Sequence, residues 1–222
     1  EFINEGRFEN FCSRPLTNFD CLLLASLVDE KLMSKFSHDE SNRHQLPKVN
    51  LTNKDIKNTW IIDPIDGTIN FLHGVPHFAI SIALKSNNEI ISGLIFDPIK
   101  DEMFYAEKEN GAFFNNHRIR VSKKSELNNC LFVTGEKVTN NIDLIYRKSG
   151  CASLDMAYVA SGRYDGYFQN NLNLWDIAAG IVLVKEAGGI INQIDLSVNT
   201  NIKIIASSAD INSKLLEKLN NF

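Results

Sequence analysis

The sequence predicts a mixed α/β fold in which a block of antiparallel strands comes first and alternating helices and strands follow. Apolar, β-branched and aromatic runs separated by short polar turns fill residues 78–107, which is typical of an antiparallel meander. From residue 152 onward, helical and strand patterns alternate along the chain. There is no repeat with a period of 20–50 residues and no long Gly/Ser/Pro linker, so we expect one body.

The first half of the chain contains one predicted helix and several strands. A helix is expected over residues 19–36, where apolar side chains form one stripe, and a polar loop over 37–58. A buried strand over 60–62 is expected to stop at Asp63-Pro64, because proline cannot donate to a ladder. The remaining strands are expected at 78–84, 89–97, 102–107, near 117–121 and at 130–134.

The second half is predicted to contain three helices and three strands. Helices are expected over 152–161 and 175–187, each followed by a glycine that can end it, and over 212–219. Strands are expected over 164–168, 190–194 and 202–206. We therefore predict one domain, 1–222, with an N-terminal α+β lobe over 1–134, which carries the antiparallel sheet, and a C-terminal α/β lobe over 135–222.

Length and charge limit the classes of function. The 222 residues include 23 Lys and Arg and 27 Asp and Glu, so the formal net charge is −4, which supplies no global field for nucleic acid or anionic lipid. An anionic ligand would therefore need a local device, such as a helix N-terminus or a bound metal ion.

The cysteines and the apolar runs predict a cytoplasmic protein that does not span a membrane. No two of the four cysteines have the Cys-x-x-Cys spacing, so a zinc or thioredoxin-like site has little support. Their scatter along the chain favours reduced thiols, with a secreted disulfide pair as the alternative. The apolar runs, such as 78–84, are much shorter than the roughly 20 residues that cross a bilayer. The first residues show no basic segment followed by an apolar one.

The strongest chemical feature is the run Asp63-Pro64-Ile65-Asp66-Gly67-Thr68. A buried strand delivers Asp63 to its end, and Asp66 follows three positions later, so both carboxylates can converge on one point. The run 67–68 can open a short helix whose N–H groups face the same space. Two carboxylates beside such N–H groups suit Mg²⁺ and a phosphate together. The alternative is an Asx turn with a helix cap, because Asp, Pro and Gly populate turns for local reasons.

A second acidic residue lies in the run WDIAAG (175–180). Asp176 stands at the start of a predicted helix, where capping alone would explain it. The functional interpretation is that the small Ala and Gly residues let this helix pack closely and direct Asp176 toward the Asp63/Asp66 site.

The other motifs in the sequence give weaker evidence for a functional site. His73 and His77 have a His-x-x-x-His spacing, but Gly74 and Pro76 between them argue against a helical metal pair. The basic pair 123–124 is expected to be a solvated surface pair. Neither a Walker-type phosphate loop nor a Gly-x-Gly-x-x-Gly motif is present.

Two long motifs resemble the inositol monophosphatase family, closest to its bacterial SuhB-type inositol-1-monophosphatases. The first is WIIDPIDGTINF (60–71), which continues through 73–78 to 81–84, and the second is WDIAAG (175–180) followed by EAGG (186–189). Their order, their spacing and weaker likenesses between them cover residues 59–207. The resemblance implies the layered αβαβα sandwich of the inositol monophosphatase and fructose-1,6-bisphosphatase superfamily.

The resemblance also implies roles for individual residues. Catalytic roles fall on Asp63, Asp66 and Thr68. The implied metal ligands are Asp63, the Ile65 carbonyl, Asp66, Asp176 and an upstream acid, for which Glu40 or alternatively Asp39 is the nearest counterpart. Substrate contacts are implied for Gly67, Thr68, Gly150, Ala152, Gln169 and Asp176. Gln169 stands where the family has a Glu, and the stretch 135–149 is shorter than its counterpart in the family.

The expected activity is Mg²⁺-dependent hydrolysis of inositol-1-phosphate or a similar phosphorylated polyol, with two or three Mg²⁺ ions and inhibition by Li⁺. Alternatives are a related phosphatase acting on histidinol phosphate, 3′-phosphoadenosine 5′-phosphate or fructose bisphosphate, and a non-catalytic relative that serves as a binding partner. The resemblance further suggests a homodimer and a partner in the transcription machinery. No basic stripe in the sequence supports direct binding of nucleic acid.

Overall fold

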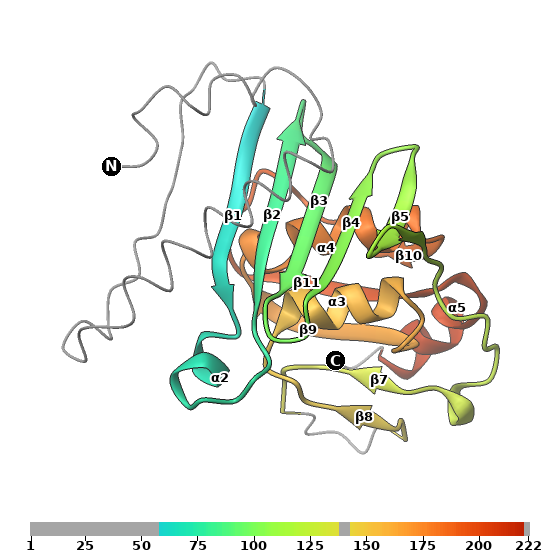
Figure 1. Cartoon of the computed structure of the whole chain (residues 1–222). Helices are drawn as coiled ribbons and strands as arrows, with labels where there is room; N and C mark the ends of the chain where they lie inside the picture. The colour runs from blue at the N-terminus through green and yellow to red at the C-terminus, as the bar shows by residue number, and fades with distance from the viewer. Residues whose placement is uncertain (1–57, 138–142, 220–222) are drawn as a thin grey trace, which may run out of the picture.

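Two β-sheets with two helices between them form the body of the protein (Figure 1). The computed structural model of the chain describes residues 58–137 and 143–219. The first sheet is antiparallel, with six strands in the order β1-β2-β3-β4-β5-β6. Its strands are β1 Asn58–Asp66, β2 Ala79–Ser86, β3 Glu89–Asp97, β4 Glu102–Glu107, β5 Gly111–Phe114 and β6 His117–Arg118. The predicted meander is confirmed.

Asparagine pairs form two tight turns of this sheet. Asn87 and Asn88 join β2 to β3 with φ angles of 48° and 61°, and Asn115 and Asn116 join β5 to β6 with 43° and 67°. These left-handed conformations match the twist of a two-residue hairpin, and asparagine tolerates them better than most residues.

The prediction that the first strand stops at Asp63 was wrong. β1 runs on to Asp66, and its pairing with β2 shifts between the Asp63–Ser81 and Asp66–Ala79 pairs. Because β1 is the edge strand of the sheet that the described residues form, Pro64 can lie within it at the irregularity without removing a needed ladder bond. The irregularity lies directly between the two aspartates of the first motif.

The second sheet has five strands in the order β10-β11-β9-β7-β8. β7 pairs in parallel with both β8 and β9, and the other pairs are antiparallel. The strands are β7 Phe132–Val133, β8 Tyr146–Arg147, β9 Gly166–Leu172, β10 Gly189–Ile191 and β11 Ile202–Ser208. The helices are α2 Thr68–Leu72, the 3₁₀ helix η2 Leu127–Asn129, α3 Ala152–Ala160, α4 Leu174–Glu186 and α5 Ala209–Lys218.

Close approach of α4 to its neighbours depends on glycine. An added Cβ on Gly93 of β3 would lie 2.7 Å from the carbonyl oxygen of Ala179 in α4. On the other side of α4, an added Cβ on Gly180 would lie 2.5 Å from the sulfur of Met156 in α3. Real Cβ atoms do not tolerate such distances, so these glycines fix how near α4 lies to β3 and α3. This confirms the close packing expected from the WDIAAG run.

Buried side chains form three layers of core. The largest cluster fills the space between the two sheets around α3 and α4, and a second lies between the second sheet and α5. A third, which includes Ile82 and Leu94, lies on the opposite face of the first sheet, because successive side chains of a strand alternate between faces. The predicted layered sandwich is confirmed, whereas the helix expected over 19–36 lies outside the described residues.

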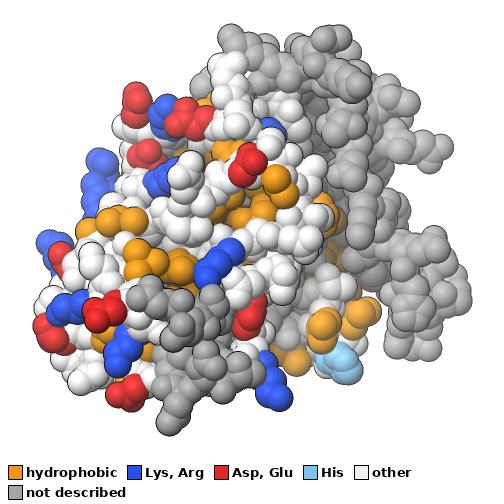
Figure 2. Space-filling model, turned by 180° about the vertical axis from the view of Figure 1, so that it is seen from behind, with side chains coloured by type: hydrophobic (Ala, Val, Ile, Leu, Met, Phe, Trp, Pro, Cys, Tyr) orange, Lys and Arg blue, Asp and Glu red, His pale blue; other side chains and the backbone are white. Residues whose placement is uncertain are grey.

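The surface carries both signs of charge. On the face that Figure 2 shows, Lys and Arg side chains are interspersed with Asp and Glu, and the described part of that face has no extended patch of one sign. None of the helices in the described part of the chain is long and apolar enough to cross a membrane. Cys130 and Cys151 are buried free thiols.

Candidate active site

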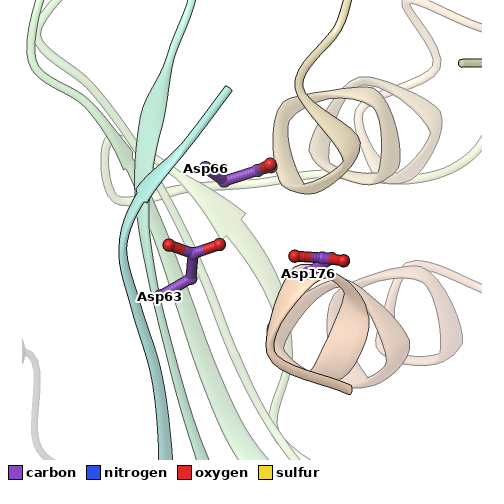
Figure 3. A group of neighbouring side chains, drawn as sticks. All are labelled: Asp63, Asp66 and Asp176. Carbon is purple, nitrogen blue, oxygen red and sulfur yellow. The ribbon is translucent and has the colours of Figure 1, made fainter. Parts of the chain in front are cut away.

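Three carboxylates converge at the end of β1 (Figure 3). Asp63 and Asp66 come from β1 and Asp176 from the first turn of α4, and one oxygen of each lies within 4.8 Å of the others. In the described part of the chain this is the one group of three or more His, Cys, Asp or Glu side chains close enough to share a metal ion. The sequence-based expectation that Asp176 joins the other two is therefore met by the geometry.

Local hydrogen bonds shape the turn that carries Asp63. The Ile65 N–H donates to Asp63 Oδ1 at 3.0 Å, and the Thr68 hydroxyl donates to the Ile65 carbonyl at 2.9 Å. The Asx turn considered from the sequence is therefore present, and it places the carbonyl of Ile65 beside the hydroxyl of Thr68. The turn and the cluster are compatible because Asp63 uses one oxygen for the turn.

Asp66 is held from the start of α3. The Ser153 N–H donates to Asp66 Oδ2 at 2.6 Å, and the Cys151 thiol lies 3.2 Å from the same oxygen. Figure 3 shows the Asp66 side chain directed toward the beginning of a helix. Asp66 is therefore fixed by contacts from a segment more than 80 residues away in the sequence.

Asp176 belongs both to the capping box of α4 and to the carboxylate cluster. Asp176 Oδ2 accepts hydrogen bonds from the Asn173 N–H at 2.8 Å and from the Asn173 side-chain amide at 3.2 Å, within a capping box. The two interpretations of Asp176 that the sequence left open are both correct. The cap orients the carboxylate, and the position of α4 brings it to Asp63.

Burial raises the pKa of all three carboxyl groups. Burial, together with the charges of Asp66 and Asp176, raises the pKa of Asp63 to about 7. Burial also raises the pKa of Asp176 to about 6, against the hydrogen bonds from Asn173, which lower it. Burial raises the pKa of Asp66, although the bonds from Ser153 oppose the rise. Three clustered acids with raised pKa values are typical of a site built around a cation.

The donor set fits Mg²⁺. Hard cations take oxygen ligands, and Mg²⁺ is held by one or a few carboxylates while substrate oxygens and water complete its shell. Asp63, Asp66 and Asp176 supply the carboxylates, and the Ile65 carbonyl lies in the same turn. Neither histidine of the His-x-x-x-His pair belongs to the cluster.

Without metal, the protein should lose stability as the pH rises. Because the folded pKa of Asp63, about 7, lies above the ordinary value of 3.8, the folded protein holds a proton that the unfolded chain has lost. The free energy of unfolding should therefore fall between about pH 4 and pH 7, by a few kcal/mol for the coupled carboxyl groups together, and then level off. Thermal melts in EDTA from pH 5 to pH 8 measure this, and Mg²⁺ should raise the melting temperature more at pH 8 than at pH 5. A melting temperature that changes neither with pH nor with Mg²⁺ would contradict the raised pKa values of the cluster.

The predicted substrate residues come from two parts of the fold, the start of α3 and strand β9. Gly150 precedes α3 with a φ of 82°, and Ala152 is its first residue. Gln169 lies on β9, where its Oε1 accepts from the Gly135 N–H at 2.9 Å and from the Tyr167 hydroxyl at 2.8 Å. Their roles toward substrate stay predictions. The upstream acid, Glu40 or Asp39, lies outside the described residues.

Four residues of the site were not singled out for these roles by sequence reasoning. Cys151, Ser153 and Asn70 act through hydrogen bonds between distant segments, for which one sequence contains no signal. Asn173 could have been found, because Asn three residues before Asp at a helix start is a capping-box pattern.

The α/β sandwich and the carboxylate cluster fit a metal-dependent phosphatase, and comparison with known proteins assigns the chain to such a family. Residues 13–221 match the model of the Inositol monophosphatase family. The chain belongs to the inositol monophosphatase family.

Named relatives and solved structures support the assignment. The chain is 38% identical to the inositol-1-monophosphatase of Caulobacter vibrioides, over 74% of this chain and 72% of that protein. It is also 38% identical to a putative Nus factor SuhB of Neisseria meningitidis, over 83% of this chain and 74% of that protein. The crystal structure of the extragenic suppressor protein SuhB from Bartonella henselae superposes with a TM-score of 0.70 at 44% identity, covering 75% of this chain and 74% of that one. Several other relatives are matched over only 54–55% of their length.

Proposed function

We propose that the protein is a Mg²⁺-dependent phosphomonoesterase that releases phosphate from inositol-1-phosphate or a similar small phosphorylated polyol. The observation that carries the proposal is the three-carboxylate cluster beside the turn at Gly67 and Thr68. Carboxylates alone would repel a phosphate, so the substrate has to arrive together with cations. The names of the relatives supply the substrate class.

The proposed metal site combines residues of the described structure with one acid that lies outside it. Two or three Mg²⁺ ions would be held by Asp63, the Ile65 carbonyl, Asp66, Asp176 and the upstream acid, Glu40 or Asp39. When bound, Mg²⁺ offsets the phosphate charge and makes water acidic enough to attack at neutral pH.

Thr68 is proposed to orient the attacking water. Because the Thr68 hydroxyl donates its hydrogen to the Ile65 carbonyl, its oxygen presents lone pairs to the site. It can therefore accept a hydrogen bond from water and fix its direction toward phosphorus. The N–H groups of Gly67 and Thr68 are proposed to bind the phosphate, and Gly150, Ala152 and Gln169 the alcohol half.

A panel of phosphomonoesters tests the proposed activity. Phosphate release should be fastest from inositol-1-phosphate, weaker from histidinol phosphate, 3′-phosphoadenosine 5′-phosphate and fructose 1,6-bisphosphate, absent in EDTA, and inhibited by Li⁺. Faster release from another member of the panel would move the substrate assignment to that compound. Release that is undiminished in EDTA would contradict the proposal.

The name of the Neisseria relative favours a second candidate function, association with the transcription machinery. In that case the protein could bind a partner without turnover. Mg²⁺ and phosphate binding without hydrolysis of any member of the panel would favour this second candidate.

We further propose a cytoplasmic homodimer with lobes at 1–134 and 135–222. The resemblance supports the dimer, and the buried free thiols are compatible with a reducing compartment. β7 already belongs to the second sheet, so the change of sheet falls between β6 and β7, shortly before the proposed lobe boundary. Light scattering on the purified protein would measure the dimer mass.

A further inference from the structure

The side chain of Asn70 bridges two segments that flank the carboxylate cluster. Its Nδ2 donates to the His77 carbonyl at 2.8 Å and to the Ser149 carbonyl at 2.9 Å, 79 residues away. A side-chain amide has two N–H donors, so both are used. The backbone carbonyl of Asn70 also accepts from the Val75 N–H at 2.8 Å. Asn70 therefore joins α2, the connection from α2 to β2, and the segment before α3.

The bridged segments meet at Gly67. An added Cβ on Gly67 would lie 3.0 Å from the His77 carbonyl oxygen, 3.2 Å from Cys151 Cβ and 3.3 Å from the Gly150 carbonyl oxygen. The carbonyl of His77 thus touches both Gly67 and the Asn70 amide. The two Asn70 bonds consequently set how closely the 149–152 segment approaches the turn at Gly67.

The 149–152 segment leads into the contacts of Asp66. Ser149 Oγ donates to the buried carboxyl group of Asp155 at 2.6 Å and accepts from the Cys151 N–H at 3.2 Å. Ser153, one residue further, donates to Asp66 from within α3. The end near Asp66 is therefore anchored by the helix, whereas the end at Ser149 depends on Asp155 and on Asn70.

Gly150 packs directly against the bridge. An added Cβ on Gly150 would lie 3.1 Å from Asn70 Nδ2. The φ of Gly150, 82°, also disfavours a residue with a side chain. The alcohol half of the substrate is proposed to contact this glycine and Ala152. The bridge thus supports one wall of the proposed substrate site without itself belonging to the metal cluster.

We infer that Asn70 is a positioning residue that sets the distance between the phosphate-binding turn and the 149–152 segment, and so governs recognition of the alcohol half of the substrate. The inference rests on the proposed function. Phosphate recognition depends on the carboxylate cluster and on the turn at Gly67 and Thr68, which Asn70 does not contact through the hydrogen bonds of its side chain.

Asn70→Asp tests the inference because it keeps the shape of the side chain and replaces both donors with an acceptor. We expect the KM for inositol-1-phosphate to rise by about 10-fold or more, as loss of two hydrogen bonds implies. The inhibition constant of inorganic phosphate should change by less than about 3-fold, because phosphate lacks the alcohol half. Asn70→Ala, which removes the donors without adding charge, should show the same split.

Asn192→Asp is the matched control. Asn192 Nδ2 also donates to two carbonyls, those of Lys203 at 3.0 Å and Gln193 at 3.3 Å, but it lies by the second sheet. Its loss should leave both constants unchanged. Equal changes in KM and in phosphate inhibition at position 70, or no change in either, would overturn the inference.

Hydrogen exchange separates this inference from the proposed activity. Amide exchange of a peptide covering 148–152 should accelerate in both Asn70 variants and stay unchanged in Asn192→Asp. Unchanged amide exchange in the Asn70 variants would overturn the inference that Asn70 positions the 149–152 segment, whatever the activity of these variants. If the unaltered protein hydrolyses none of the phosphomonoesters, the proposed function fails, and the role toward the alcohol half fails with it, even where exchange accelerates.

Discussion

Asp63→Asn should abolish most Mg²⁺-dependent phosphate release while leaving the metal-free protein as stable as before or more stable. Changes to residues that only support metal ligands cost about 10–100-fold in activity, so loss of a ligand should cost at least about 100-fold. The gain in stability follows because burial and neighbouring charges raise the pKa of Asp63 to about 7, so its ionised form disfavours folding at pH 8. Initial rates and thermal melts in EDTA measure the two effects.

Asp195→Asn is the control for this prediction. The Asp195 carboxylate accepts from the Ser197 N–H and hydroxyl in an exposed loop, away from the cluster. Its removal should leave phosphate release unchanged. Equal release by the Asp63→Asn and unaltered proteins would contradict the assignment of Asp63 as a ligand.

Gly93→Ala should lower the free energy of unfolding more than the other changes proposed. It should also lower activity, although Gly93 does not belong to the carboxylate cluster. The new Cβ would lie 2.7 Å from both the Ala179 carbonyl oxygen and Val182 Cγ1, so α4 has to move away from β3. Overpacking of this kind costs about 1–3 kcal/mol, and here a backbone atom blocks relaxation. Because α4 carries Asp176, its displacement should also weaken the cluster. Denaturant unfolding and Mg²⁺-dependent rates measure the two effects.

Gly188→Ala separates backbone strain from displacement of the helix. Gly188 follows α4 with a φ of 88°, and an added Cβ would meet nothing within 4 Å. The change should cost about 1 kcal/mol through backbone strain, with the activity retained. Full activity in Gly93→Ala would contradict the role of close packing in directing Asp176.

The sequence predicted most of the fold because periodicity and turn residues are local. The runs over 89–97 and 102–107 match β3 and β4, and the glycines after α3 and α4 mark their ends. The two-residue strand β8 and the 3₁₀ helix η2 were missed, since neither is long enough to show a period. Continuation of β1 through Pro64 depends on its edge position, which only the assembled sheet defines.

The site could be predicted in part. The spacing of Asp63 and Asp66 predicted a paired site, and Asp176 was brought in by the small residues of its helix. The contacts that orient these acids, such as Ser153 to Asp66, join segments 87 residues apart and depend on tertiary packing. The interpretation of Lys124 as merely solvated was wrong, because its Nζ pairs with the buried Asp165 at 2.9 Å. A buried acid needs such a partner, but the sequence does not show that Asp165 is buried.

Calorimetric titration of Mg²⁺ into the metal-free protein, with and without inorganic phosphate, tests most directly whether the cluster is a metal centre that accepts phosphate. Binding of Mg²⁺ should be detected, should tighten when phosphate is present, and should weaken by at least about 10-fold in Asp176→Asn. A folded protein that binds Mg²⁺ neither alone nor with phosphate, or that binds it equally well after the Asp176→Asn change, would contradict the assignment.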